Sequence, residues 1–380
     1  MDVLFTGLGS IGTRHLKNLH AVAAEKGIPV RAWALRSSAR ELPAETRALL
    51  AGEMTKLPAD AHYDAAFITN PTHLHFDTLQ MLRGKADALF IEKPIFDSTD
   101  RRLADCLLPG QKAYVAAPMR WCGTMLALNK AMPGLSVYSA RVICSSYLPD
   151  WRPDVDYRTV YSAHRDMGGG VAIDLIHEWD YLTELFGTPE EIFCFKGTYS
   201  HLEIDSDDLA VYIARYPSLL CEVHLDYFGR QYRRAIELFC KNGTVTADFG
   251  AGTLTLEDGT VQEYPEPVNE RYLREMAYFL DYAQSGANAA TNAGTNTGTN
   301  TGTNAGMNMG ANADTNTGTN AETNTGTNAG MSTGANAGTN TGANAAANAG
   351  ANTGTDANAS VSVNPPGTAL DVLKLTLGER

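Results

Sequence analysis

The stretch "DVLFTGLGSIGTRHLKNL", residues 2–19, decides the fold of this chain. A short apolar segment runs into three glycines, Gly7, Gly9 and Gly12, and an amphipathic helical pattern follows them. In a strand–turn–helix unit, the first glycine allows the tight turn and the second lets a pyrophosphate approach the backbone. The third glycine lets the helix pack closely on the strand. The stretch therefore predicts a dinucleotide-binding unit at the start of a parallel sheet.

The start of the predicted helix adds two cofactor contacts, Ser10 and Ile11, because free N–H groups and the helix dipole favour an anion there. The second strand, in residues 30–38, ends where an Asp or Glu would bind the ribose hydroxyls of NAD(H). This chain has Arg36 and Ser37 at that point, and a guanidinium with a hydroxyl suits a 2′-phosphate. The sequence therefore favours NADP(H). An arginine that only stacks on the adenine would not discriminate, so NAD(H) stays open.

Two further buried strands, "AAFIT" and "ALFIE", bracket a helix and continue the β/α alternation of a parallel sheet. Asn70 and the pair Glu92-Lys93 follow these strands, at the carboxyl ends where open α/β sheets bind ligands. We expect Asn70, His75 and Glu92 to contact the cofactor and Lys93 to belong to the same site. His73 and His75 have no third ligand nearby in the sequence, so no metal site is predicted.

Composition narrows the class of protein. The 380 residues carry a formal net charge of -13, which argues against a nucleic-acid partner. No apolar run reaches the roughly 18–20 residues that cross a bilayer, and the N-terminus begins at once with a strand-like segment. The six cysteines form no CxxC pair, which is typical of reduced, mostly buried thiols. We expect a cytoplasmic protein with neither a nucleic-acid nor a membrane partner.

Residues 287–363 repeat a four-residue unit, T/A-N-T/A-G, with three acids, no Lys or Arg and no aromatic residue. Such a segment cannot bury enough apolar surface to offset the entropy of ordering, so we predict a disordered spacer. A stacked ladder of asparagines is the alternative. The repeat interrupts the connection between a predicted helix in residues 269–286 and an amphipathic final helix in residues 364–380.

Three motifs, "GLGSIGTRHLKNL", "ITNPTHLH" and "FIEKP", resemble in order and spacing the glucose–fructose oxidoreductase, inositol dehydrogenase and rhizopine catabolism family (Gfo/Idh/MocA). The resemblance covers nearly the whole chain apart from the repeat. It implies an N-terminal Rossmann domain with a doubly wound parallel sheet, residues 1–118. A C-terminal α/β domain with an open, mostly antiparallel sheet follows in residues 119–286, and residues 364–380 complete the fold. Segments such as "VYSARVICSSY" and "LLCEVHLDYF" are typical of its strands. The resemblance also implies a homodimer or homotetramer.

The stretch "GGGVAIDLIHEWD", residues 168–180, combines a flexible glycine triplet with Asp174, His177 and Glu178. Helical spacing of three and four residues predicts that these side chains point roughly together. The resemblance implies that Lys93 lies beside the nicotinamide and that a histidine four residues after an aspartate acts as acid/base. Here His177 follows Asp174 by three residues, and Glu178 occupies the fourth position. We expect Lys93, Asp174 and His177 to be catalytic and Glu178 to be a substrate contact and the fallback acid/base.

The segment before the glycines offers further substrate contacts, namely Trp151, Arg152 and Tyr157. Aromatic faces suit a sugar ring, and a guanidinium suits a carboxylate or phosphate. The alternative is a loop that covers the sheet, with its arginines paired to neighbouring aspartates. Arg120, in "PMRW", resembles a family position at the pocket edge and is also predicted to contact the substrate.

Together these features predict an NAD(P)-dependent oxidoreductase. It would transfer a hydride between nicotinamide and a hydroxyl-bearing carbon of a sugar, a sugar derivative (acidic or nucleotide-linked) or a cyclitol. His177 would accept the hydroxyl proton, Lys93 would stabilise the alkoxide, and Asp174 would hold the hydroxyl or the imidazole. Two alternatives stay open: an NAD-assisted glycosidase of the same fold, and a catalytically silent sensor that binds cofactor and a partner protein. Retention of Lys93 and His177 favours the enzyme.

Overall fold

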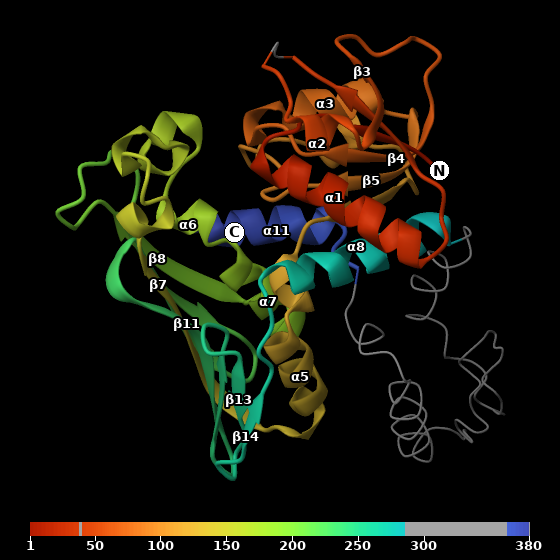
Figure 1. Cartoon of the computed structure of the whole chain (residues 1–380). Coiled ribbons are helices and arrows are strands. Elements are labelled where there is room, and N and C mark those ends of the chain that lie inside the picture. Colours follow the sequence, from red (N-terminus) through yellow and green to blue (C-terminus); the bar gives the residue numbers. More distant parts are fainter. Residues whose placement is uncertain (38–39, 286–362, 380) are drawn as a thin grey trace, which may run out of the picture. The chain divides into compact units, whose positions relative to one another are not determined.

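A computed structural model describes residues 1–37, 40–285 and 363–379 (Figure 1). The repeat lies outside these residues apart from Val363, and so does the prediction that it is disordered.

The N-terminal strands form a six-stranded sheet in the order β3-β2-β1-β4-β5-β6, and every pairing in it is parallel. The strands are β1 (Asp2–Phe5), β2 (Arg31–Leu35), β3 (Leu50–Met54), β4 (Tyr63–Ile68), β5 (Ala86–Ile91) and β6 (Lys112–Val115). The helices between them are α1 (Ser10–Glu25), α2 (Ala44–Arg47), α3 (His75–Leu82) and α4 (Leu103–Cys106). Strand order reverses between β1 and β4, which opens a ligand-binding crevice at the carboxyl ends of these strands. The predicted doubly wound sheet is confirmed, with β3 as an additional strand.

The second sheet has eight strands in the order β14-β13-β12-β11-β7-β10-β9-β8. Its strands are β7 (Val137–Tyr147), β8 (Glu191–Gly197), β9 (Leu209–Arg215), β10 (Leu220–Asp226), β11 (Phe228–Cys240), β12 (Thr244–Asp248), β13 (Thr253–Thr255) and β14 (Val261–Glu263). Only β7 and β10 pair in parallel, so the predicted mostly antiparallel sheet is confirmed.

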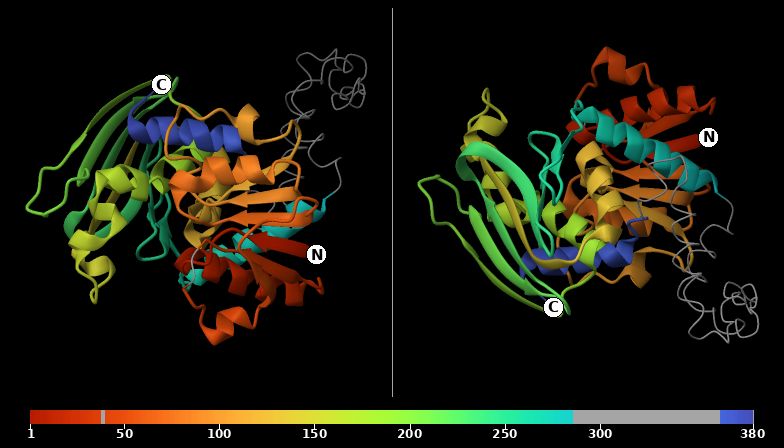
Figure 2. Two further views of the ribbon diagram at one scale, coloured as in Figure 1. Left: turned by 90° about the horizontal axis from the view of Figure 1, so that it is seen from above. Right: turned by 90° about the horizontal axis from the view of Figure 1, so that it is seen from below.

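One face of this second sheet is apolar. Ala140, Val142 and Cys144 alternate along β7 and are buried, as a strand with one covered face requires. The same side carries α5 (Gly123–Ala131), α6 (Val171–Asp174) and α7 (His177–Phe186) (Figure 2).

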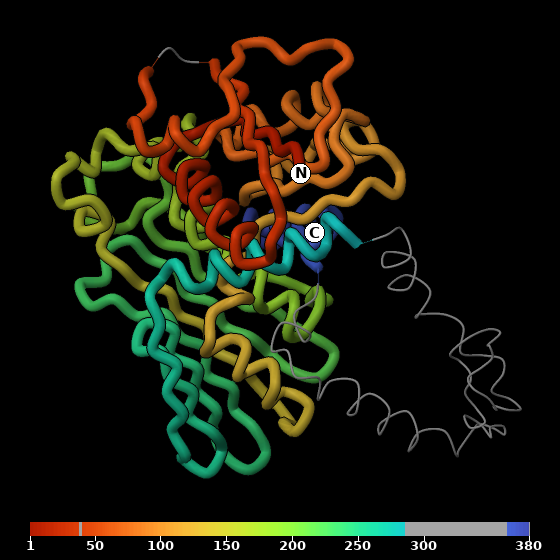
Figure 3. The backbone as a smooth tube through the Cα atoms, turned by 45° about the vertical axis from the view of Figure 1, so that its right-hand side comes forward, coloured from red at the N-terminus to blue at the C-terminus, as the bar shows by residue number. Residues whose placement is uncertain are grey.

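Two helices return from the end of the chain to the parallel sheet. Helix α8 (Asn269–Gln284) runs beside α1 (Figure 3) and places Phe279 in edge contact with Phe67 and Phe90, at 5.3 and 5.1 Å between ring centroids. This helix was expected with the second domain, but it packs into the core of the first sheet. Helix α11 (Pro366–Leu377), predicted from the pattern after the repeat, contacts α6, α7 and β6.

Within the described part of the chain, no helix is both long and apolar enough to cross a membrane. All six cysteines are free thiols, and five of them are buried.

Candidate active site

The three glycines of the first turn meet different surroundings. A Cβ on Gly7 would lie 2.8 Å from the Cα of Asn70, and a Cβ on Gly12 would lie 2.1 Å from the carbonyl oxygen of Gly7. A Cβ on Gly9 would meet no atom within 4 Å. The first and third glycines are therefore required by packing, while the second leaves open surface in front of α1.

The N-terminus of α1 is suited to an anion. Its N-cap residue, Gly9, provides no side-chain cap, and the first turn contains no acidic residue. An α-helix leaves its first N–H groups, here including those of Ser10 and Ile11, without an intrahelical acceptor. Together with the dipole and the open surface at Gly9, these groups fit the pyrophosphate of a dinucleotide.

The ribose end of the cofactor site contains a carboxylate that the sequence analysis missed. Nη1 of Arg36 lies 2.7 Å from Oε2 of Glu53, and its Nη2 donates to the carbonyl of Arg40. Glu53 lies on β3, opposite Ala34 of β2. Because Glu53 neutralises Arg36, the arginine no longer argues by itself for a 2′-phosphate. Ser37 is exposed next to this pair.

His75 joins the ends of two neighbouring strands. Its buried ring nitrogens lie 3.0 Å from the carbonyl oxygen of Asn70 and 3.2 Å from that of Ile95. Burial lowers the pKa of His75, which keeps the ring neutral. The Asn70 side chain donates to Thr78, 2.8 Å away, while its Oδ1 is buried without a hydrogen bond to the described residues. Among those residues, no cluster of three or more potential ligands forms a metal site.

Glu92 is held by a residue far away in the sequence. Its Oε1 lies 2.7 Å from Nε2 of His15, a fully buried residue of α1. Burial alone would raise the pKa of Glu92, but His15 and then Lys93 hold it below its ordinary value. The next residue, Lys93, donates from Nζ to the main-chain oxygen of Asp174 at 3.1 Å. Lys93 therefore connects the parallel sheet to the glycine-triplet segment.

The expectation that Asp174, His177 and Glu178 point together from one helix is wrong. The segment forms two helices, because α6 ends at Asp174 and α7 begins at His177. Leu175 leaves the helical path at φ -98° and ψ 30°. The three side chains therefore point into different surroundings.

Asp174 is buried and surrounded by hydroxyl groups. Donors to its carboxylate come from Tyr161, from Ser162 at 2.6 Å and from Tyr227 at 2.6 Å. Both carboxylate oxygens already accept protein hydroxyls, so the contact from Asp174 to Lys93 is made by its main-chain carbonyl.

Glu178, the fallback acid/base, is fully buried. It accepts two hydrogen bonds from Arg234, at 2.8 Å from Nε and 2.7 Å from Nη2. This bidentate pair satisfies the charge of the carboxylate inside the protein. Glu178 therefore holds α7 against β11, and His177 is the stronger acid/base candidate.

His177 and Lys93 line one cavity. Its other lining residues come from the ends of β5 and β6, from α7 and from the segment after the repeat: Pro94, Ile95, Val115, Ala116, Ile176, Asp180, Asn364, Ala369 and Val372. Burial holds the pKa of His177 well below its ordinary value, and three cations act in the same direction, Lys93, Arg234 and Arg271. The imidazole is therefore neutral near pH 7, the state that accepts a proton.

The structure brings three predicted substrate residues together. Trp151, Arg152 and Tyr157 line a second cavity. The ring of Trp151 contacts the edge of Tyr227, with 5.3 Å between centroids, and Tyr227 in turn donates to Asp174. The alternative of paired loop arginines holds for Arg158, which binds Asp156. It does not hold for Arg152, for which the described part of the chain offers no ion pair.

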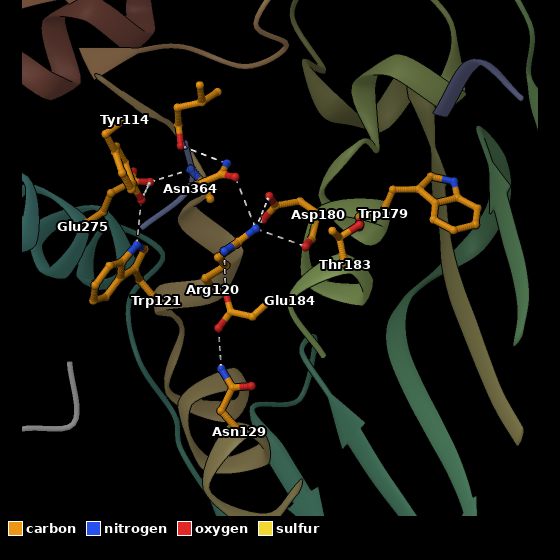
Figure 4. A network of polar contacts seen from close by, with 12 residues as sticks. Tyr114, Arg120, Trp121, Asn129, Trp179, Asp180, Thr183, Glu184, Glu275 and Asn364 are labelled. Carbon is orange, nitrogen blue, oxygen red and sulfur yellow. Dashed lines mark hydrogen bonds and ion pairs between the residues drawn. The ribbon is translucent and has the colours of Figure 1, made fainter. Parts of the chain in front are cut away.

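Arg120, predicted to contact the substrate, points into the protein instead (Figure 4). Its side chain is 2% exposed, and it binds Asp180 at 3.0 Å and Glu184 at 2.7 Å. The guanidinium of Arg120 is thus paired with two carboxylates. No signal in the sequence indicated this pairing, since 60 positions separate Arg120 from Asp180.

Solved structures share this architecture at low sequence identity. The WlbA dehydrogenase from Bordetella pertussis, in complex with NADH and UDP-GlcNAcA, is 17% identical; the match covers 74% of this chain and 88% of that chain at a TM-score of 0.58. Levoglucosan dehydrogenase, in complex with NADH and levoglucosan, is 16% identical, with 75% and 90% coverage and a TM-score of 0.62. The myo-inositol 2-dehydrogenase from Lactobacillus plantarum is 16% identical, with 76% and 92% coverage and a TM-score of 0.59. Identities this low show a common fold.

Family models match both halves of the chain. Residues 1–106 match an oxidoreductase family with an NAD-binding Rossmann fold, and residues 138–246 match the GFO/IDH/MocA C-terminal domain. No curated protein sequence matches the chain. The two family models, in the same order as the two sheets, agree with the glycine turn and with the Lys93 position. The chain belongs to the Gfo/Idh/MocA family of oxidoreductases.

Proposed function

We propose that this protein is a nicotinamide-dependent dehydrogenase or reductase of a sugar, a sugar derivative or a cyclitol. The observation that carries the proposal is the cavity at the carboxyl ends of the parallel strands, in which a neutral His177 and Lys93 both lie. When bound, the nicotinamide supplies hydride transfer. Residues Gly9, Ser10 and Ile11 would hold its pyrophosphate.

Side chains of the protein carry out the proton transfer. Because His177 is neutral near pH 7, it accepts the proton of the reacting hydroxyl in the oxidation direction and returns it in the reduction direction. The Lys93 ammonium stabilises negative charge on the hydroxyl oxygen. The carbonyl of Asp174 fixes the position of Lys93. Asp174 acts through Lys93, since its carboxylate is taken by hydroxyl groups.

The charges near His177 favour an acidic substrate. Of the three cations there, Arg234 is neutralised by Glu178. Lys93 and Arg271 form no ion pair within the residues that the structure describes. Nη1 of Arg271 donates to the sulfur of Met119 at 2.9 Å, and its Nε is buried without a hydrogen bond to the described residues. A carboxylate or phosphate on the sugar would pair with Lys93, the cation that lines the cavity. The UDP-GlcNAcA bound to the WlbA dehydrogenase has both.

The geometry around Arg36 supports NAD(H) over NADP(H), which reverses the sequence-based preference. A carboxylate next to the ribose position accepts hydrogen bonds from ribose hydroxyls and repels a 2′-phosphate. Glu53, which reaches Arg36 from β3, would supply this carboxylate. We place the cofactor-binding unit at residues 1–118 and the substrate-binding unit at residues 119–286, with α8 packed on the former.

The outward face of the second sheet supports a homodimer. Phe193 and Phe195 on β8 are 60% and 74% exposed, and Ile213, directly opposite Phe193 on β9, is 44% exposed. Exposed apolar residues this close together are typical of an interface between subunits. Free thiols fit a reducing compartment, so we propose a cytoplasmic location.

The test is a substrate screen with matched variants. Purified protein is incubated with NAD⁺ or NADP⁺ and a panel of neutral, acidic and nucleotide-linked sugars and cyclitols, and absorbance at the nicotinamide band is followed. Lys93→Met and His177→Asn should each lose turnover while they retain nucleotide binding. Nucleotide binding without turnover of any compound would favour the sensor. Cleavage of a glycosidic bond without net nicotinamide reduction would favour the glycosidase.

A further inference from the structure

A buried polar cluster connects the two sides of the repeat (Figure 4). At its centre is Arg120, in the short helix Pro118–Trp121 that follows β6. Arg120 binds Asp180 and Glu184 of α7, and its Nη2 also donates to Oδ1 of Asn364 at 3.3 Å. Asn364 lies just before α11 and is 2% exposed. A residue after the repeat is therefore part of a cluster that otherwise belongs to residues before it.

Asn364 is bound to β6 as well. Its main-chain oxygen accepts from the N–H of Val115 at 2.9 Å, and its Nδ2 donates to the carbonyl of Val115 at 3.1 Å. One side chain thus donates to a strand and accepts from Arg120. Among side chains of this size, only an amide combines a donor and an acceptor in this way. Aspartate lacks the donor, and leucine lacks both.

The same cluster borders the cavity that contains His177. Asn364 and Asp180 line that cavity together with His177 and Lys93. Asp180 follows His177 by three positions in α7, so the two side chains share one face of that helix. Asn364 therefore connects the end of β6, through Arg120 and Asp180, to the helix that begins with His177.

We propose that Asn364 is a positioning residue, which acts through Arg120 and Asp180 to hold His177 toward Lys93. The inference rests on the proposed function of His177 as proton acceptor. It makes the segment after the repeat part of the catalytic unit. The catalytic geometry then depends on residues from both sides of the repeat, and not only on the two family domains.

The experiment compares three variants of the full-length protein. Asn364→Leu removes both hydrogen-bonding groups at similar volume, and Asn364→Asp keeps only the acceptor for Arg120. The matched control is Thr376→Val on α11. Thr376 is fully buried, and the substitution removes the hydrogen bond that its hydroxyl donates to the carbonyl of Val372 at 2.8 Å, within the same helix. Thr376 does not line the cavity. Thermal unfolding and nucleotide affinity are measured for each variant to establish that it is folded.

Two readouts are used, one of them independent of turnover. The rate at which diethylpyrocarbonate modifies His177 is followed by peptide mass spectrometry as a function of pH, and kcat and KM are measured with the best substrate. We expect Asn364→Leu to lower kcat about 10-fold or more, with nucleotide affinity unchanged, because small misplacements of a reacting group have effects of this size. The modification rate of His177 and its pH midpoint should change as well. Asn364→Asp should lie between Asn364→Leu and wild type, and Thr376→Val should match wild type.

The proposal is overturned if a folded Asn364→Leu keeps the kcat and the His177 modification profile of the wild type. It is also overturned if Thr376→Val loses as much activity as Asn364→Leu, since the effect would then be one of stability. If Asn364→Leu does not fold, Asn364→Asp decides by the same two criteria. A changed His177 profile in a protein that oxidises no sugar would refute the proposed function and leave the positioning role intact.

Discussion

Replacing Glu53 by glutamine should change which nicotinamide nucleotide the protein prefers. Glu53 holds Arg36 at 2.7 Å, and the two side chains are 30% and 14% exposed. In Glu53→Gln, the carboxylate that would repel a 2′-phosphate is gone, and Arg36 keeps its charge. The variant should therefore bind NADPH more tightly, and NADH less tightly or equally.

The size of the effect follows from the electrostatics of a partly exposed site. Two unit charges about 4 Å apart interact by about 1 kcal/mol in water and about 4 kcal/mol at an effective dielectric constant of 20. A partly screened site lies toward the lower figure. A change of about 1.4 kcal/mol corresponds to a 10-fold change in Kd, which is the expected shift in the NADPH-to-NADH ratio.

Nicotinamide fluorescence titration with each nucleotide measures this ratio without knowledge of the substrate. Glu45→Gln on α2 is the matched control, because it removes the same charge from a fully exposed pair with Lys17. Wild type should prefer NADH, and the control should behave like wild type. A wild type that already prefers NADPH, or a ratio that Glu53→Gln leaves unchanged, would refute the assignment of Glu53.

Four further outcomes are expected. Because the pKa of His177 is depressed and the neutral ring is the base, kcat/KM for oxidation should be constant between pH 6.5 and 8 and fall only at lower pH. If kcat/KM already begins to fall above pH 7 as the pH is lowered, this assignment is contradicted. Glu178→Gln should lower the free energy of unfolding in urea by about 3 kcal/mol, because Arg234 loses its buried partner, whereas loss of activity at full stability would make Glu178 the acid/base. Phe195→Glu should produce monomers in light scattering if the exposed face of β8 joins two copies, and an unchanged mass would exclude that face. Cleavage at a protease site placed within residues 286–362 should leave α11 bound and turnover intact, and release of the fragment on gel filtration would contradict the packing of that helix.

The sequence predicted those parts of the fold whose causes are local. The roles of Gly7, Gly9 and Gly12 depend on atoms of one turn and the neighbouring strand, so the six-residue motif, read together with the strand before it and the helix after it, identifies the unit. The alternation of buried residues along β7 and the amphipathic pattern of α11 are likewise contained in their own segments. Lys93 was indicated by its place after a buried strand.

The partners of the charged groups could not be predicted in this way. Asp174 is satisfied by Tyr161, Ser162 and Tyr227, and the last of these is 53 positions away. The bond between Glu92 and His15 spans 77 positions. Helical spacing alone placed Asp174 and Glu178 on one face, but the helix is interrupted between them and the two carboxylates have different partners. Pairings of this kind are properties of the folded core, and no pattern in a single segment contains them.

In the described part of the site, the carboxylates are paired and two of the cations are not, and this difference is relevant to the choice of substrate. The carboxylates described in the site each have their own partner: His15 for Glu92, Arg234 for Glu178, Arg120 for Asp180 and three hydroxyl groups for Asp174. The side chains of Lys93 and Arg271, by contrast, form no ion pair among the residues that the structure describes. The chain as a whole carries a net charge of -13, so this local excess of positive charge opposes the field of the rest of the protein. Burial first, and then the charge of Lys93 and of the nearby arginines, lowers the pKa of His177, and under the proposed function the ammonium of Lys93 in the cavity would also attract an anionic sugar. If the proposed function is correct, the charge of Lys93 contributes both to the neutral state of His177 and to a preference for an acidic substrate.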